Sequence, residues 1–237
     1  VIRVADPERL TAEIPGEPAA PRTAHFPGSR GSIGWIAAAR TAEGKLGVAW
    51  DDEMSGKRVR AAWVSEENPG EPTAAEILEV SDPAMYCEGV RSTVDGSALW
   101  LGFTCCPPEQ FCITQRPYAA VWSPGEPLHP SPLAPIGKVY ELSTLVREGT
   151  HAAVAMVRHE DTYYQLTVRR ADAEAPQDAL KGLARAADID LPEAIGDHLA
   201  GASGCFVEDT LVLAWTEPAG EGDGRCRLAR VVPDGSV

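Results

Sequence analysis

The tetrapeptide Pro-Gly-Glu-Pro occurs three times in this chain, and its even spacing places the strongest restriction on the fold. The copies begin at residues 15, 69 and 124, so the intervals are 54 and 55 residues. A fixed period of this length indicates a chain built from repeated supersecondary units. Any fold assigned to the sequence must explain that period.

Four short apolar runs recur with nearly the same period, and each ends in a large side chain. Each run is too short for a helix and is bounded by turn-forming residues, so each predicts a buried strand. Gly44, Gly96 and Asp209 stand just before three of the runs, as expected for tight hairpin turns. The runs are residues 45–50, 98–103, 151–156 and 210–215.

A further strand is predicted on each side of every apolar run. The preceding strands are residues 34–40, 90–94, 142–146 and 205–207. The following strands are residues 58–65, 118–123, 164–170 and 225–231, and a fourth strand is predicted at residues 75–80. Three or four antiparallel strands in each repeat of this length are typical of a β-propeller blade.

The sequence therefore predicts an all-β fold, a propeller of four antiparallel blades and a partial N-terminal blade. One small sheet cannot bury both of its apolar faces, so neighbouring sheets must stack face to face. A β-sandwich is the alternative, but it leaves the regular interval unexplained. The expected boundaries are a partial blade or closing segment at 1–30, blades at 31–82, 83–137 and 138–201, and an incomplete blade at 202–237.

An insertion at residues 172–201 interrupts the third blade. Residues 178–187 have helical spacing of apolar side chains, and residues 192–199 are predicted to form a second helical turn or two. We expect a surface elaboration that replaces the outer strand of that blade, because loops tolerate insertions. A lid or docking element is the alternative.

The chain is strongly acidic, with a formal net charge of −14. This charge argues against binding to a phosphate backbone, and no basic stripe with interleaved aromatic residues is present, so nucleic acid is not an expected partner. No run of 18 apolar residues occurs, and no transmembrane segment is predicted.

The six cysteines favour disulfides and an extracytoplasmic location, whether secreted, periplasmic or at the cell surface. Buried free thiols in a cytoplasmic protein are the alternative. No C-x-x-C spacing is present, so the usual zinc and redox motifs are missing. One predicted bridge joins Cys205 to Cys226, and another joins Cys87 to Cys105, Cys106 or Cys112.

Two groups of polar residues are candidate sites. Asp51, Asp52 and Glu53 follow an apolar run and could bind calcium or act as acid and base, but a solvated turn is favoured because no calcium-loop motif is present. A polar hairpin tip is likewise favoured over a metal site for His151, His159, Glu160 and Asp161. No catalytic signature or cofactor-binding motif appears, so no cofactor or metal is expected.

The aromatic residues at equivalent repeat positions have two readings. A ring of aromatic side chains could bind sugar, but recurrence at the same place in each repeat favours packing between blades. The residues are Trp50, Phe103 and Trp215 on the apolar runs, and Trp63 and Trp122 on the strands that follow.

The unit formed by residues 43–50, a polar loop and residues 58–65 resembles blades of sialidase-like and related bacterial secreted propellers. Those families often carry an Asp box, S-x-D-x-G-x-T-W, and residues 92–96 are loosely similar to it with the Asp displaced by one position. Sialidases use an arginine triad and a Tyr–Glu pair. The resemblance implies candidates for these roles, namely Arg40, Arg91, Arg147, Tyr140 and Glu141.

Because no catalytic motif is present, the sequence favours a non-catalytic binding or scaffolding propeller that engages a protein or glycan partner. A sialidase-like glycan hydrolase or lyase is the first alternative, and it requires arginine, tyrosine and carboxylate groups to converge at one end of the axis. A subunit or fragment of a larger surface assembly is the second, suggested by the incomplete terminal repeats.

Overall fold

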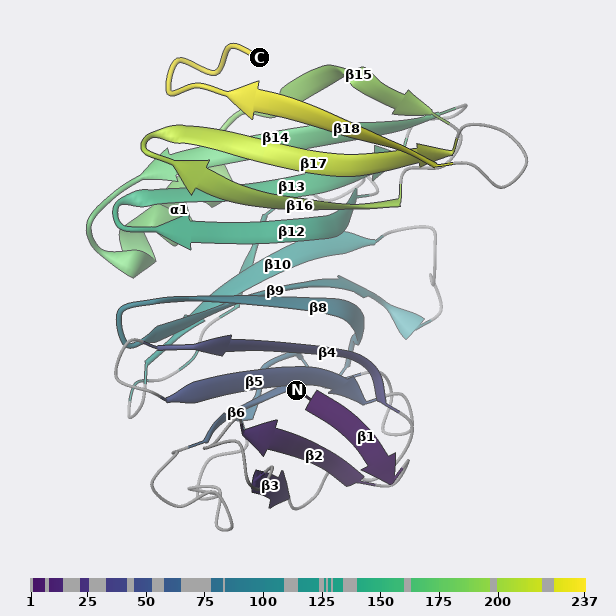
Figure 1. Cartoon of the computed structure of the whole chain (residues 1–237), viewed down its shortest axis with the longest axis vertical. Coiled ribbons are helices and arrows are strands. Elements are labelled where there is room, and N and C mark those ends of the chain that lie inside the picture. The colour runs from purple at the N-terminus through teal and green to yellow at the C-terminus, as the bar shows by residue number, and fades with distance from the viewer. Residues whose placement is uncertain are drawn as a thin grey trace.

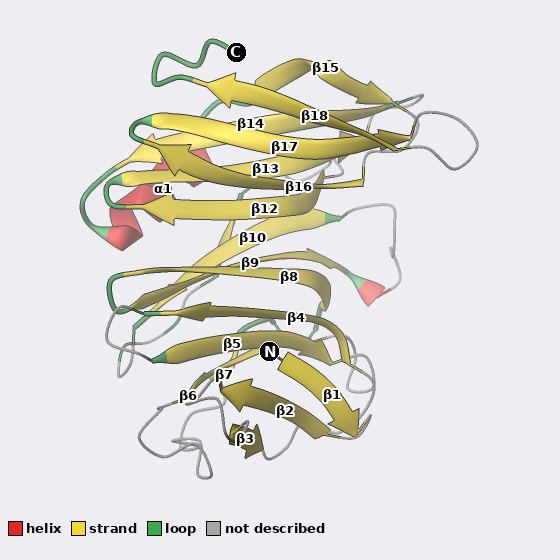
Figure 2. Cartoon of the chain, in the orientation of Figure 1, coloured by secondary structure: helices red, strands yellow, loops and turns green. Residues whose placement is uncertain are grey.

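A computed structural model describes residues 2–6, 9–14, 22–25, 33–41, 45–52, 58–64, 78–82, 84–108, 115–123, 126, 128, 130–133, 140–159, 163–196, 200–218 and 224–237. Strands dominate it, and they form five separate antiparallel sheets (Figures 1 and 2). The Pro-Gly-Glu-Pro copies lie outside the described residues, apart from Glu126.

The five sheets follow one another along the chain. The first contains β1 (Ile2–Asp6), β2 (Arg9–Ile14) and β3 (Arg22–His25). The second sheet contains β4 (Ile33–Arg40), β5 (Leu46–Asp52), β6 (Arg58–Val64) and β7 (Leu78–Glu79). The third sheet contains β8 (Tyr86–Asp95), β9 (Ala98–Cys106), β10 (Arg116–Trp122) and β11 (Ser131–Pro132). The fourth sheet contains β12 (Tyr140–Glu148), β13 (His151–His159), β14 (Tyr164–Asp172) and β15 (Ile189–Gly196). The fifth sheet contains β16 (Ala200–Val207), β17 (Thr210–Pro218) and β18 (Gly224–Val231).

The chain is a β-propeller, as the repeat predicts. The leading strands of the second to fifth sheets, β4, β8, β12 and β16, contact one another in sequence and are called the inner strands below. In Figure 1 the first sheet lies at the bottom, and the fourth and fifth sheets overlap at the top. Among the described residues no strand of the first sheet pairs with β18, so the N-terminal strands form a sheet of their own.

Apolar side chains fill the spaces between neighbouring sheets. The predicted apolar runs are the second strands β5, β9, β13 and β17, and every residue of β9 is buried. Trp63 and Trp122 meet between the second and third sheets with ring centroids 5.8 Å apart, which confirms that these aromatic residues pack between blades. Backbones also approach closely there, since a Cβ atom on Gly102 would lie 2.4 Å from Leu142 Cδ2.

The three described hairpin turns between inner and second strands share one backbone feature. Gly96 and Gly149 have φ values of 57° and 55°, in the left-handed region that glycine enters without a steric penalty. The equivalent turn between β16 and β17 places Glu208 at φ 58°. The glycine predicted in the turn before β9 is therefore confirmed at Gly96, whereas the glycine at 149 was not predicted, and Gly44 lies outside the described residues. The turn before β17 instead places a glutamate in this region, at some cost in strain.

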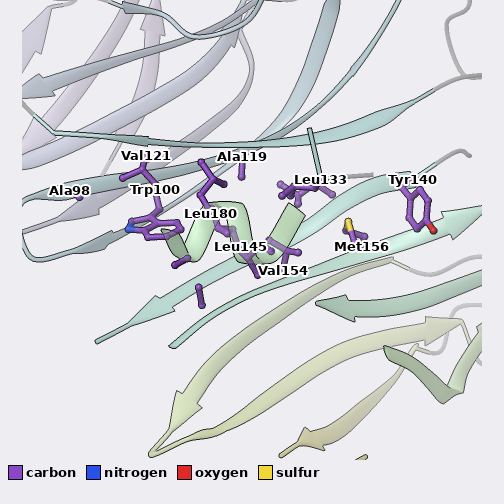
Figure 3. Packing of buried hydrophobic residues seen from close by; sticks show 14 residues of the cluster. Ala98, Trp100, Ala119, Val121, Leu133, Tyr140, Leu145, Val154, Met156 and Leu180 are labelled. Atoms are coloured by element: carbon purple, nitrogen blue, oxygen red, sulfur yellow. The ribbon is translucent and has the colours of Figure 1, made fainter. Parts of the chain in front are cut away.

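The insertion in the fourth sheet differs from its prediction. Helix α1 (Pro176–Arg185) forms where helical spacing was found, and it buries Ala179, Leu180 and Leu183. Figure 3 shows Leu180 among side chains of the third and fourth sheets, including Trp100 and Val121. The helix fills the space between these two sheets.

The expected helical turn at residues 192–199 is wrong over its described part, because residues 189–196 form strand β15. This strand pairs with β14, so the insertion adds a helix and keeps the outer strand. Burial of Leu191 against the fifth sheet favours the strand. The side-chain amide of Gln165 donates a hydrogen bond to the carbonyl of Leu191 and fills an irregularity in the pairing.

Among the described cysteines one disulfide forms, between Cys87 and Cys105, which face each other across β8 and β9. The expected bridge between Cys205 and Cys226 does not form, and both thiols are free and exposed. These residues lie on opposite sides of β17, facing Val212 and Thr216, so about two strand spacings and four residues separate them. That separation exceeds the reach of a disulfide. Cys106 is buried, and Cys112 lies outside the described residues.

Among the described helices, none is long and apolar enough to cross a membrane.

Candidate functional site

Each of the four inner strands has a β-bulge near the point where it begins. Their pairing with the second strand shifts register between Ile33 and Ile36, between Glu88 and Arg91, between Leu142 and Thr144, and between Ala200 and Ala202. Such bulges leave backbone groups unpaired within the ladder and redirect neighbouring side chains, which is why they are common beside active sites. The repeated bulges therefore mark one end of the inner strands as a place for function.

Asp51 ties two of these bulges together. One carboxylate oxygen accepts a hydrogen bond from the backbone N–H of Trp35 at 2.7 Å, and the other accepts one from Gly89 N–H at 3.1 Å. Burial raises the pKa of this carboxyl, while the backbone hydrogen bonds oppose the shift and the negative charge of Glu88 adds to it. The expected solvated turn is thus wrong for Asp51, which is buried at the end of β5 and positions the starts of β4 and β8.

Trp35 and Arg91 form a stacked pair on these positioned strands. Trp35 is 51% exposed, the guanidinium of Arg91 lies 4.6 Å from its ring centroid, and the pair has cation–π geometry. Arg91 donates from Nε to the carbonyl of Ser143 and from Nη1 to the carbonyls of Gly89 and Val90. Burial lowers the pKa of Arg91, and the charges of Glu141 and Asp51 oppose that shift. The arginine is therefore locked by the backbone of two inner strands.

The fourth sheet contributes Glu141 and His159 to the same end. Glu141 lies at the start of β12 with a side chain 59% exposed, and its Oε2 is 3.9 Å from His159 Nε2. The ring of His159 meets that of Tyr164 edge-on, with centroids 4.6 Å apart. His159 Nε2 is buried and has no hydrogen-bond partner. An exposed carboxylate beside a histidine with an unused nitrogen is suited to proton transfer.

We call Trp35, Asp51, Glu88, Arg91, Glu141 and His159 the inner-strand cluster. It draws on the second, third and fourth sheets, and Coulombic interactions connect Glu88 to Asp51 and Glu141 to Arg91. Glu217 stands at the same end of the fifth sheet, where Trp215 and Arg227 hold its carboxylate. Four successive sheets thus each place at least one carboxylate at this end.

The candidates implied by the sialidase resemblance are only partly brought together. Arg91 and Glu141 lie in the inner-strand cluster, but Arg40 is at the far end of β4. Arg147 is buried near the far end of β12, where its Nε binds Asp95 at 2.9 Å and its Nη2 donates to the carbonyl of Ala173. Arg147 therefore joins two hairpin turns to the segment before α1.

Tyr140 begins the same strand as Glu141 but points toward the opposite face of the sheet. Its hydroxyl donates to Asp188 at 2.7 Å, and burial followed by this hydrogen bond raises its pKa to about 12. Asp188 also binds Arg169, so Tyr140 belongs to a polar network beside the third sheet.

The sequence does not predict Trp35, Glu88 or the role of His159. Trp35 has no equivalent aromatic residue in the other repeats, so no repeat pattern marks it. The sequence predicts one polar hairpin tip for His151 and His159, but these residues occupy opposite ends of β13. Within the described part of the chain, no group of three or more His, Cys, Asp or Glu side chains is arranged to hold a metal ion.

Comparison with known proteins gives a match in structure only. No family model and no curated protein matches the sequence. The fold is similar to that of the endo-arabinase from Bacteroides thetaiotaomicron, with 12% identity, a TM-score of 0.53 and coverage of 100% of this chain and 90% of that one. It is also similar to the Penicillium chrysogenum α-L-arabinanase complexed with arabinobiose, with 10% identity, a TM-score of 0.51 and coverage of 93% and 66%.

An ulvan lyase of polysaccharide lyase family 25 has 9% identity and a TM-score of 0.51, with 93% of this chain and 60% of that one covered. The chain spans only about half the length of some similar structures, including 47% of a Bombyx mori β-fructofuranosidase. These similarities support the propeller fold but do not single out sialidases.

The expectation of a non-catalytic binding or scaffolding propeller is corrected by these findings. Similar structures are glycan-cleaving enzymes, an arabinase, an arabinanase and a lyase. The enzymatic alternative predicted that ionisable groups converge at one end of the fold, and the inner-strand cluster brings five of them together. The alternative reading, an enzyme that acts on glycans, accounts better for both observations.

Proposed function

We propose that the protein cleaves glycosidic bonds, as a hydrolase or a lyase. The observation that carries this proposal is the convergence of an exposed tryptophan, an arginine, carboxylates and a histidine at the bulged starts of the inner strands. Aromatic rings offer a flat apolar surface to sugars, and carboxylates and histidines transfer the protons that bond cleavage requires. The glycan-cleaving activities of the similar structures agree with this chemistry.

Within this proposal Glu141 acts on the substrate, because its carboxylate is exposed while that of Asp51 is buried. His159 lies beside Glu141 and exchanges a proton with it. Asp51 is a positioning residue, since both of its oxygens are held by backbone N–H groups. We expect a substitution of Asp51 to lower activity indirectly, by displacing Trp35 and the start of β8.

The proposed location is outside the cytoplasm. The disulfide between Cys87 and Cys105 supports it, because such bonds persist in oxidising compartments.

The function is tested by incubating the purified protein with a panel of neutral and anionic polysaccharides. Hydrolysis produces new reducing ends without new double bonds, whereas a lyase produces unsaturated sugars that absorb ultraviolet light. We expect products from at least one polysaccharide and none with heat-inactivated protein. A complete absence of products across the panel would overturn the proposal.

A further inference from the structure

We infer that the inner-strand cluster binds uncharged glycans, with a sugar ring on Trp35, and does not accept uronates or other anionic sugars. This inference rests on the proposed function and narrows it to hydrolysis of neutral glycans. It follows from three features of the cluster: the tryptophan surface, the hydrogen bonds already made by Arg91, and the local charge.

Trp35 has the properties of a binding platform. Half of its surface is exposed, although the other five tryptophans are all buried. Its backbone is fixed by the hydrogen bond to Asp51, and Arg91 lies against one face of its indole ring. A rigid, exposed indole buries apolar surface without losing conformational freedom on binding. Sugar rings carry C–H faces that suit such a surface.

Arg91 cannot bind a carboxylate through the usual pair of parallel hydrogen bonds. That geometry needs two parallel N–H groups from one edge of the guanidinium. In Arg91 the Nε–H is donated to Ser143, and Nη1 donates to both Gly89 and Val90. Each edge suited to a carboxylate therefore includes a donor that is already bonded to the backbone.

The charge around Trp35 also opposes an anionic ligand. Asp51, Glu88 and Glu141 act electrostatically within the cluster, with Arg91 as their cationic neighbour, and the whole chain carries a net charge of −14. Like charges repel over roughly 8 Å at physiological salt. An uncharged sugar avoids this repulsion and still offers hydroxyl groups to Glu141 and His159.

The consequence for chemistry is a preference for hydrolysis over elimination. Lyases remove a proton next to the carboxylate of a uronate, and a neutral sugar has no such acidic proton. In hydrolysis the bond between the anomeric carbon and the leaving oxygen breaks, and a water oxygen bonds to that carbon. One proton from the water is transferred, through the protein, to the leaving oxygen.

The inference is tested by native gel electrophoresis through gels containing arabinan, another neutral polysaccharide, polygalacturonate or alginate. We expect at least one neutral polysaccharide to retard the wild type and neither polyuronate to do so. Trp35→Ala should weaken the retarding interaction by about tenfold or more, and Trp35→Phe should retain part of it. Leu228→Ala, an exposed apolar residue of the fifth sheet, serves as the matched control.

The outcomes separate this inference from the proposed function. The inference would be overturned if a polyuronate retarded the protein, or if no polysaccharide retarded it. It would also be overturned if the Trp35→Ala variant bound as strongly as the wild type. Unsaturated products from a polyuronate would overturn it while leaving glycan cleavage intact. Trp35-dependent binding of a neutral glycan without any cleavage would support the inference and count against the enzymatic function.

Discussion

Asp51 shows how one buried side chain arranges a site that it does not itself expose. Its two oxygens accept hydrogen bonds from the bulged starts of β4 and β8, which present Trp35 and Arg91. The same place in the next repeat is occupied by Thr104, whose hydroxyl accepts a hydrogen bond from Leu142 N–H of β12. A polar side chain at the end of the second strand thus holds the next inner strand in at least two sheets.

Tyr140 gives a pH-dependent prediction at this scale. Its pKa is raised to about 12 in the folded state, whereas an unfolded tyrosine titrates near about 10. The unfolded chain therefore loses this proton first, so the stability due to Tyr140 is present below pH ~10 and is lost as pH rises toward about 12. Urea denaturation at several pH values should show a smaller decline across this range for Tyr140→Phe than for the wild type. Equal declines would contradict the assigned environment.

Glu208 gives a second residue-scale prediction. Because it occupies the left-handed position that glycine fills in two equivalent turns, Glu208→Gly should stabilise the protein by about 0.5–1 kcal/mol. Gly149→Ala, the reverse change at φ 55°, should destabilise it. Thermal melts of both variants check the pair, and a lower melting temperature for Glu208→Gly would mean that the turn is wrongly assigned.

At the scale of strands and helices, the sequence is informative wherever burial is periodic. The apolar runs predicted the second strands because those strands are buried on both faces, as in β9. The region at 192–199 was wrongly predicted because a short apolar segment with Pro192 has no clear period, and pairing with β14 decided its structure. The inner-strand cluster could not be predicted, since residues from three sheets meet only through the bulges and the stacking of sheets.

The disulfide of the third sheet leads to a prediction at this scale. The bridge closes a segment of 18 residues between β8 and β9, so replacing both Cys87 and Cys105 by Ala should lower the free energy of unfolding by about 2–4 kcal/mol. Replacing Cys205 and Cys226 by Ala should have a much smaller effect, because both thiols are free and exposed. Denaturation curves of the two double variants test this, and equal losses would contradict the pairing.

The close approach between sheets gives another prediction. Gly102→Ala would place a methyl group 2.4 Å from Leu142 Cδ2, so we expect a loss of about 1–3 kcal/mol. Gly201→Ala is the matched control, because no atom lies within 4 Å of its added Cβ. Chemical denaturation of both variants checks the packing of the inner strands. A Gly102→Ala variant as stable as the control would show that these two sheets are not so closely packed.

For the whole molecule, sheets stacked side by side bring equivalent strand ends together. The inner strands contact one another in order, so side chains near the bulges of different strands can meet in a shared site. One end carries Trp35, Arg91, Glu141 and His159, while the other end carries Arg147 and Asp95 in a structural network. Under the proposed function, the two ends of the fold therefore have different roles, one in binding and chemistry and one in holding the hairpins together.

The most direct test of this division compares two glutamates of the same strand, on the polysaccharide that the wild type cleaves. Glu141 lies in the inner-strand cluster, whereas Glu148 is exposed at the opposite end of β12. The rate of reducing-end release should fall about a hundredfold or more for Glu141→Gln and stay at the wild-type level for Glu148→Gln. Full activity of Glu141→Gln, with both variants folded, would contradict the assignment of the active site to this end of the propeller.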